Sequence, residues 1–222
     1  MNASAPAAEQ RRRIRIGGRV QGVGFRPFIY RLAKTYALIG WVGNTADGVV
    51  VEIQGRVQAI DEFLHALRRN APIEALINSL DIATIACSEE REFSIVDNVE
   101  TAPNEAAGDL TLPLDIAVCE QCRRELFDPD NRRYRHPFIA CCDCGPRWSA
   151  LTTLPWNRAN TALAPFSLCE NCNAEYTNAA DRRLHAQNNC CPNCGPQLSL
   201  WNRHAEIVAE REAALSDAVD AL

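Results

Sequence analysis

Four regularly spaced cysteine pairs organise the chain: Cys119-x2-Cys122, Cys141-x2-Cys144, Cys169-x2-Cys172 and Cys191-x2-Cys194. Eighteen residues separate the first pair from the second, and eighteen separate the third from the fourth. When the sequence is shifted by 50 residues, this stretch aligns with itself. Glu125 then aligns with Glu175, and the Arg-Arg pair at 132–133 aligns with the Arg-Arg pair at 182–183. Such an internal repeat indicates a duplicated structural unit.

The cysteine spacing predicts two metal sites. One Cys-x2-Cys turn supplies two thiolates, and a second turn completes a tetrahedron for Zn²⁺. The repeat favours sequential sets over an interleaved cross-brace, so the expected ligands are Cys119, Cys122, Cys141 and Cys144, and then Cys169, Cys172, Cys191 and Cys194. We expect two closed structural Zn²⁺ sites, with the arginine pairs of each loop screening the thiolate charge. A disulfide scaffold is the alternative.

Composition narrows the class of protein. The 222 residues suggest two or three small domains, and a net charge of −5 argues against a general nucleic-acid binder. No apolar run is long enough for a membrane span, and the polar start contains no secretory leader. Paired cysteines without a leader are typical of metal binding in a reducing compartment, so we expect a cytoplasmic protein.

The first hundred residues alternate strand and helix patterns. Apolar residues alternate from Ile14 to Val20, and a helical period covers 25–36. Strands at 40–42 and 49–53 flank Asp47-Gly48, which is typical of a hairpin turn. A second helix at 57–67 and strands at 79–87 and 92–96 complete a βαββαβ order. The pattern predicts an α+β fold of the ferredoxin-like kind.

These patterns divide the chain into five segments. We expect a disordered N-terminus (1–10), the α+β domain (11–98), a linker (99–114), the duplicated four-cysteine domain (115–200) and a helix (201–222). The chain stops inside this amphipathic helix, so we expect a piece of a longer protein.

A glycine-rich loop joins the first strand to the first helix and reads Gly18-Arg19-Val20-Gln21-Gly22-Val23-Gly24-Phe25-Arg26. Such a turn can direct backbone N–H groups at an anion, and the helix N-terminus adds partial positive charge. Arg26 can clamp a phosphoryl group, and Asn44, at the end of the neighbouring strand, can position a water. Neither segment contains a general base, so hydrolysis would depend on positioning and electrostatics. A reactive mixed anhydride suits such a site.

Two groups of motifs resemble known families. The glycine loop, taken with Gly40-Trp41-Val42-Gly43-Asn44-x2-Asp47-Gly48, resembles the acylphosphatase signature, in which the arginine binds phosphate and the asparagine orients the attacking water. The resemblance implies these catalytic roles for Arg26 and Asn44, and phosphate binding for Gln21, Gly22, Val23, Gly24, Phe25 and Arg26. The cysteine array resembles the HypF family of hydrogenase-maturation carbamoyltransferases through Asp115-Ile116-Ala117-x-Cys119, Arg132-Arg133-Tyr134, Pro137-Phe138, Cys144-Gly145-Pro146-Arg147, Asn160-Thr161 and Arg182-Arg183-x-His185-Ala186-Gln187.

The second resemblance implies a role in protein maturation. In that family an acylphosphatase-like domain cleaves carbamoyl phosphate, and a YrdC-like domain adenylates the carbamate with ATP. A final domain delivers the carbamoyl group to HypE, as the precursor of the cyanide ligands of NiFe-hydrogenase. The resemblance therefore implies an acylphosphatase-like domain at 11–98, a two-zinc finger domain at 115–200 and the start of a truncated YrdC-like domain at 201–222. ATP and HypE are expected only for the full-length enzyme.

Other interpretations remain open. A zinc-ribbon adaptor that binds phosphate or nucleic acid without turnover would use the arginines at 123, 124, 132, 133, 135, 147, 182 and 183. A free-standing acylphosphatase would leave the cysteine array unexplained. We expect Cys87 to be buried in a strand. The Cys-x2-Cys register excludes Cys142 and Cys190 from the preferred ligand sets, and a role as alternate ligand or redox-sensitive thiol stays open for either. For His185, contact behind a metal site and packing between domains are both open.

Overall fold

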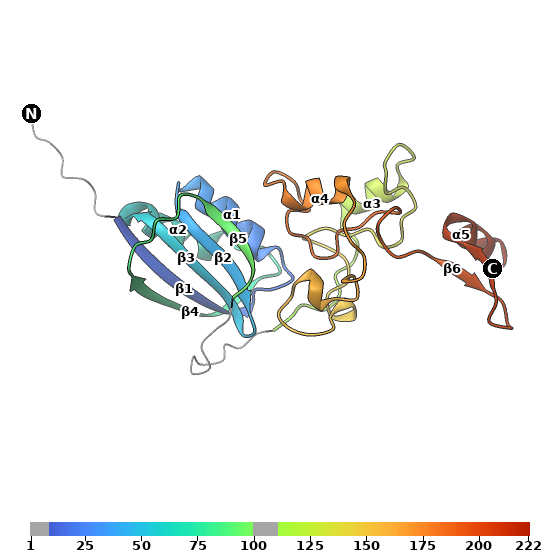
Figure 1. The fold of residues 1–222 in the computed structure, drawn as a ribbon, viewed down its shortest axis with the longest axis horizontal. Helices are drawn as coiled ribbons and strands as arrows, with labels where there is room; N and C mark the ends of the chain where they lie inside the picture. Colours follow the sequence, from blue (N-terminus) through green and yellow to red (C-terminus); the bar gives the residue numbers. More distant parts are fainter. Residues whose placement is uncertain (1–8, 100–110) are drawn as a thin grey trace, which may run out of the picture.

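The computed structural model describes residues 9–99 and 111–222. Its N-terminal domain is a five-stranded sheet with two helices (Figure 1). Its elements are β1 (Glu9–Arg19), α1 (Phe25–Thr35), β2 (Ile39–Thr45), β3 (Gly48–Arg56), α2 (Val57–Arg69), β4 (Leu76–Ile85) and β5 (Phe93–Asn98). The strand order is β4-β1-β3-β2-β5, antiparallel except for the parallel pair β2 and β5. The ferredoxin-like prediction is confirmed.

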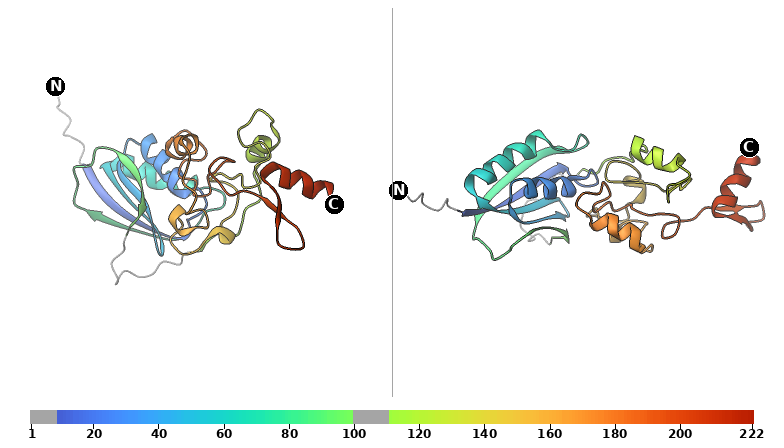
Figure 2. Two further views of the ribbon diagram at one scale, coloured as in Figure 1. Left: turned by 45° about the vertical axis from the view of Figure 1, so that its right-hand side comes forward. Right: turned by 90° about the horizontal axis from the view of Figure 1, so that it is seen from above.

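The core of this domain lies between the sheet and the two helices, which pack on the same face (Figure 2). Ile14 and Ile16 of β1 share that face because residues two apart in a strand point to the same side. Other fully enclosed side chains include Phe25, Ile29, Val42, Val51, Ile53, Ile60, Phe63 and Leu67. Their removal from water is the main force that holds the glycine loop against the sheet.

The site-bearing segments meet at one edge of the sheet. β1 ends at Arg19 and leads into the glycine loop, while β2 ends at Thr45 beside the turn into β3. The register pairs Ile16 with Val49 and Thr45 with Gly48, so the ends of β1 and β2 flank the start of β3. This pairing brings the glycine loop next to the end of β2, although the two are about twenty residues apart in the sequence.

Two sequence predictions need correction, and a third lies mostly outside the described residues. β1 begins at Glu9, so residues 9 and 10 belong to the sheet, and residues 1–8 lie outside the described part. Most of the predicted linker, 100–110, also lies outside it. The prediction for Cys87 was wrong: β4 ends at Ile85, and Cys87 is exposed in the loop that follows.

The cysteine-rich module follows as two similar halves (Figure 1). Each half has one short helix that starts directly after the first cysteine of its pair: α3 (Glu120–Phe127) and α4 (Glu170–Thr177). Two 3-10 turns, Trp148–Ala150 and Arg158–Asn160, lie between the halves. The two helices begin 50 residues apart in the sequence, which is the period of the repeat. The sequence repeat is therefore also a structural repeat.

The C-terminal segment is only partly helical, which corrects the prediction of a helix over 201–222. It forms a hairpin of β6 (Ser199–Trp201) and β7 (Ile207–Glu210), followed by α5 (Arg211–Asp220). The side chain of Asn202 accepts from the backbone N–H of His204 and Glu206, at 2.8 and 3.1 Å, and closes the turn that reverses the chain. Among the described residues, no helix has the length and apolar character needed to cross a membrane.

Candidate functional site

Two glycines shape the loop between β1 and α1. Gly22 and Gly24 both have φ 73°, in the left-handed region that glycine enters without steric cost. Gly24 is the N-cap of α1 and gives it no side-chain cap, so the first N–H groups of the helix remain available to an anion. The side chains of Val23 and Phe25 are buried in the core, which leaves their backbone N–H groups as their contribution to a cradle.

Gln21 ties the loop to its surroundings through its side chain. Its Nε2 donates to the carbonyls of Thr45 and Gly48 at 2.8 and 2.6 Å. Its Oε1 accepts from the backbone N–H of Trp156 at 2.7 Å. Gln21 therefore joins the glycine loop to the β2–β3 turn and to the cysteine-rich module, which no local pattern indicated.

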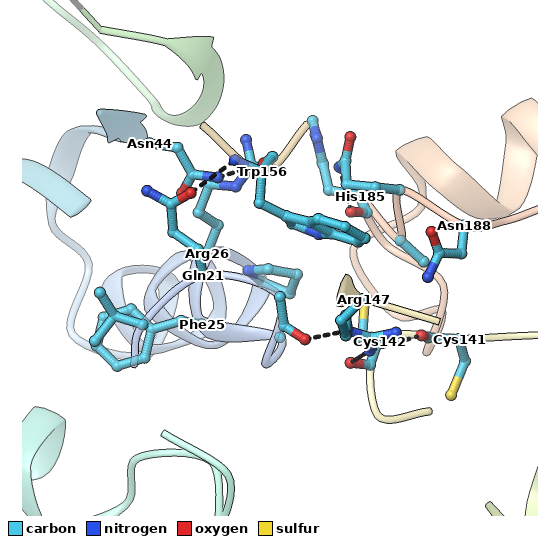
Figure 3. Close-up of a pocket in the computed structure, with 16 residues that line it drawn as sticks. Gln21, Phe25, Arg26, Asn44, Cys141, Cys142, Arg147, Trp156, His185 and Asn188 are labelled. Carbon is cyan, nitrogen blue, oxygen red and sulfur yellow. Dashed lines mark hydrogen bonds between the residues drawn. The ribbon is translucent and has the colours of Figure 1, made fainter. Parts of the chain in front are cut away.

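Arg26 and Asn44 converge on one atom, the carbonyl oxygen of Trp156 (Figure 3). Asn44 Nδ2 donates to it at 2.6 Å, and Arg26 makes a long contact of 3.5 Å. The guanidinium of Arg26 has further contacts of 3.4 Å with the carbonyls of Val96 and Asp97. Burial lowers the pKa of Arg26, and no carboxylate hydrogen-bonds to it in the described structure. A buried cation with such weak partners favours a bound anion.

A cavity of about 30 Å³ lies at this point, with room for about two water molecules. The glycine loop, Arg26 and Asn44 form one wall, and the cysteine-rich module forms the other (Figure 3). The wall from the module contains Cys142, Arg147, Trp156, His185 and Asn188 among others. The candidate site is therefore shared between the two modules.

Arg147 holds the two walls together. Its Nε donates to the carbonyl of Gly22, and its other guanidinium nitrogens donate to the carbonyls of Cys144 at 2.9 Å and Cys142 at 2.8 Å. The side chain is 2% exposed. Since its donors are engaged by backbone carbonyls, Arg147 organises the cavity and leaves Arg26 as the cation available to a ligand.

The eight paired cysteines form two groups in the predicted sequential order. The sulfur atoms of Cys119, Cys122, Cys141 and Cys144 lie within 4.8 Å of one another, as do those of Cys169, Cys172, Cys191 and Cys194. Individual separations are 3.6–3.8 Å. Four thiolates at about 2.3 Å from one Zn²⁺ in a tetrahedron would be separated by about 3.8 Å. Both groups therefore have the spacing that Zn²⁺ requires.

Two further cysteines of the module, Cys142 and Cys190, belong to neither group. Cys142 donates from Sγ to the carbonyl of Leu184 at 3.1 Å, and burial raises the pKa of its thiol to about 12. Cys190 lies 3.3 Å from the ring of His136, and burial raises its pKa to about 11. Both thiols are packed against neighbouring loops, Cys142 on the carbonyl of Leu184 and Cys190 on the carbonyl of Phe138.

The arginine pairs cross between the repeats. Arg132 donates to Cys172 Sγ at 3.3 Å, and Arg182 donates to Cys122 Sγ at 3.0 Å, so each pair reaches the sulfur group of the other repeat. Arg133 bonds to Glu175 at 2.5 Å, and the related pair of Arg183 and Glu125 repeats this contact. The sequence led us to expect that each arginine pair would screen the thiolates of its own loop. In the structure each pair screens the thiolates of the other repeat. The exchange makes the two halves one unit.

Loss of one crossed ion pair should destabilise this unit. Burial acts to raise the pKa of Glu175, but hydrogen bonds from Arg133 and Arg132 lower it to about 2. Because the folded pKa is depressed, the stabilisation is present above about pH 4.5 and lost as the pH falls toward 2. Glu175→Gln should lower the free energy of unfolding at pH 7 by about 2–4 kcal/mol, since it leaves the buried Arg133 without its carboxylate partner. Amide hydrogen exchange across α4 measures this change.

Glu120→Gln is the matched control for that variant. Glu120 occupies the other finger helix and pairs with Arg123 and Arg124 on the surface. Exchange in α3 and α4 should stay at the wild-type rate in this control. Equal exchange in Glu175→Gln and Glu120→Gln would contradict a stabilising role for the crossed pairs.

The structure thus brings the sequence-predicted loop, Arg26 and Asn44 to one cavity and adds a second wall. Arg147 and His185 stand in motif segments that the sequence had singled out, whereas Trp156 and Asn188 carried no signal. Nothing in the cysteine spacing indicated that these segments face the glycine loop, because contact between the modules depends on tertiary packing.

Two family models match the chain. The Acylphosphatase model matches residues 12–95, and the HypF finger model matches residues 118–151 and again 168–201. The double match agrees with the repeat. Together the models cover the lining residues of the cavity except Trp156, which lies between the two finger matches.

Curated relatives and solved structures give the same picture. Carbamoyltransferase HypF of Synechocystis sp. is 49% identical over 209 residues, which are 94% of this chain and 27% of that protein. Carbamoyltransferase HypF2 of Cupriavidus necator is 46% identical over 69% of this chain and 19% of its own length. The crystal structure of T. kodakarensis HypF superposes with a TM-score of 0.82 at 35% identity, covering 96% of this chain and 26% of that one. The chain thus spans 19–27% of the length of these HypF relatives.

Proposed function

Because this chain belongs to the HypF family and combines an acylphosphatase domain with two HypF fingers, we propose that its cavity hydrolyses an acyl phosphate, with carbamoyl phosphate as the physiological substrate. The supporting observation is the convergence of Arg26 and Asn44 beside the N-terminus of α1. A cation, an amide and unpaired backbone N–H groups at one point form a binding site for a phosphoryl group next to a held water.

In the proposed reaction the phosphoryl group binds at Arg26, while Asn44 Nδ2 stays bonded to the Trp156 carbonyl. Arg26 and the N–H groups of the loop bind the phosphoryl oxygens, and Asn44 orients a water toward phosphorus. The water oxygen bonds to phosphorus as the bond from phosphorus to the acyl oxygen breaks. The acyl group leaves as a carboxylate, or as carbamate from carbamoyl phosphate, and the protons of the water remain on the phosphate product.

We further propose that each group of four cysteines holds one structural Zn²⁺. The sulfur separations fit the ion, and all four positions are filled by protein ligands, which leaves no position for substrate. Bound zinc supplies folding free energy to the module, and the module in turn positions Trp156, Arg147 and His185 at the cavity.

The later steps belong to parts of the family's proteins beyond the region matched here. We propose that in a full-length enzyme the released carbamate is activated with ATP and transferred to HypE, in the maturation of NiFe-hydrogenase. Thiolate ligands must stay reduced, so we expect this to occur in the cytoplasm. The chain described here supplies the hydrolytic step and the zinc-bound module.

The arginines of the structure give little support to a nucleic-acid adaptor. Arg133, Arg147 and Arg183 are buried and bonded within the molecule. Arg123 and Arg124 pair with Glu120 on the surface. A continuous basic surface is what a sequence-independent binder requires, and these side chains do not provide one.

Release of phosphate from carbamoyl phosphate and acetyl phosphate tests the proposal. Asn44→Ala should lower kcat by about 10²-fold, as is usual when a group positioned for the transition state is removed. Asn70→Ala, which removes the exposed amide at the end of α2, is the matched control and should retain wild-type turnover. Wild-type chain without phosphate release, or an Asn44→Ala variant as active as Asn70→Ala, would contradict the assignment.

A further inference from the structure

His185 is the only histidine, among the described residues, that lines the cavity of Arg26 and Asn44 (Figure 3). It belongs to the 182–187 segment, whose role the sequence left open. Its Nδ1 is buried and has no hydrogen-bond partner. Because an unpaired buried ring nitrogen is costly, it points to a ligand in the cavity.

The internal repeat places His185 at a position whose backbone conformation and hydrogen bond occur in both halves of the module. Its counterpart 50 residues earlier is Arg135, and both have a left-handed backbone, with φ of 49° and 53°. Their backbone N–H groups make the same bond to a finger helix, to Tyr176 at 2.9 Å and to Leu126 at 2.8 Å. Arg135 pairs with Glu212 on the surface, whereas His185 faces the cavity. The same backbone conformation thus carries an arginine on the surface in the first repeat and a histidine at the cavity in the second.

Neighbours hold the imidazole in place. The ring of Tyr176 packs against it with 4.7 Å between ring centres. Gln187 Nε2 donates to the Tyr176 hydroxyl at 3.0 Å and to the carbonyl of His185 at 2.6 Å. Burial, with the charge of Arg26, lowers the pKa of His185 to about 4, so the ring is neutral at pH 7.

Asn44, which lines the same cavity, has a second unpaired acceptor. Its Nδ2 donates to the carbonyl of Trp156 at 2.6 Å, and this bond determines which end of the amide is the oxygen. The remaining atom, Oδ1, is buried without a partner. A cavity of about 30 Å³ with two unpaired acceptors suits a water molecule, which has two O–H groups to donate.

We propose that His185 is a catalytic residue that holds the attacking water together with Asn44. With its proton on Nε2, the ring offers Nδ1 to one O–H of the water, while Asn44 Oδ1 accepts the other. The lone pairs of the water oxygen are then free to face phosphorus. This inference rests on the proposed hydrolysis and assigns to the second finger a direct part in it.

The step needs no additional reactant. The water oxygen forms a bond to phosphorus, the bond from phosphorus to the acyl oxygen breaks, and the electron pair leaves on the carboxylate. Both protons of the water end on the phosphate product, so His185 returns unchanged. The residue lowers the cost of orienting the water before the bond forms.

The test uses three variants of the full chain with acetyl phosphate as substrate and inorganic phosphate as inhibitor. His185→Phe keeps a ring against Tyr176 but removes the acceptor. His185→Asn keeps an acceptor and tolerates the left-handed backbone. Arg135→Phe imposes the same backbone strain at the repeat-related position and is the matched control.

We expect His185→Phe to lower kcat by about 10²-fold, with KM and the inhibition constant of phosphate within about threefold of wild type. His185→Asn should recover most of kcat, and Arg135→Phe should match wild type. Equal kcat in His185→Phe and Arg135→Phe would overturn the inference, and so would a loss of phosphate binding as large as the loss of kcat. An inactive wild-type chain would overturn the proposed hydrolysis itself, and with it this assignment.

Discussion

Arg26→Ala is expected to reduce acyl phosphate hydrolysis by at least about 10³-fold, a loss at the upper end for one preorganised transition-state donor. Arg26 is 5% exposed, and its contacts are limited to carbonyl oxygens at 3.4–3.5 Å. The other arginine of the cavity, Arg147, is bonded to the carbonyls of Cys144 and Cys142. Without Arg26 the cavity therefore has no cation free to bind the phosphoryl oxygens. Phosphate release and calorimetric binding of inorganic phosphate both measure the loss.

Two further variants distinguish the loss of the guanidinium group from general damage to the structure. Arg26→Lys keeps the charge but loses the fork that binds two oxygens at once, so turnover should recover only in part. Lys34→Ala removes an exposed cation from the same helix and should behave as wild type. Wild-type kcat and phosphate affinity in Arg26→Ala would refute the site assignment.

Cys122→Ser is expected to have the largest effect on stability. Cys122 is fully buried, belongs to the first sulfur group and accepts from Arg182 of the other repeat at 3.0 Å. Structural Zn²⁺ in small domains contributes about 10–16 kcal/mol of apparent binding free energy, which is also folding free energy. The variant should bind at most one equivalent of zinc and lose hydrogen-exchange protection in α3. Because the crossed arginines link the halves, protection in α4 should fall as well.

The acylphosphatase domain provides the internal reference for that experiment. Its sheet and core are formed within residues 9–98, so protection in β1 and β3 should persist in Cys122→Ser. Turnover should nevertheless fall, because Trp156 and His185 reach the cavity from the damaged module. Cys87→Ser, which changes an exposed cysteine outside both groups, should retain two zinc equivalents. Two equivalents in Cys122→Ser would contradict the ligand assignment.

Local patterns predicted much of the fold. The alternation through Ile14 and Ile16 and the hairpin at Asp47-Gly48 led to the correct strands, because both depend on residues adjacent in the chain. The helix expected over 201–222 is correct only for α5, because the Asn202 turn and the β6–β7 hairpin occupy the first part of that segment. Cys87 was misplaced because burial depends on where β4 ends, which its own apolar neighbours do not determine.

The sequence by itself determined the two modules, the grouping of the eight cysteines and the loop that carries Arg26, since each follows from spacing along the chain. Only the tertiary structure decided that the arginine pairs cross between the repeats and that the second finger closes the cavity at Arg26. In the chain, His185 lies 141 residues from Asn44. Contacts over such separations arise from the packing of whole modules, in which many weak interactions are satisfied together. No local pattern contains that information.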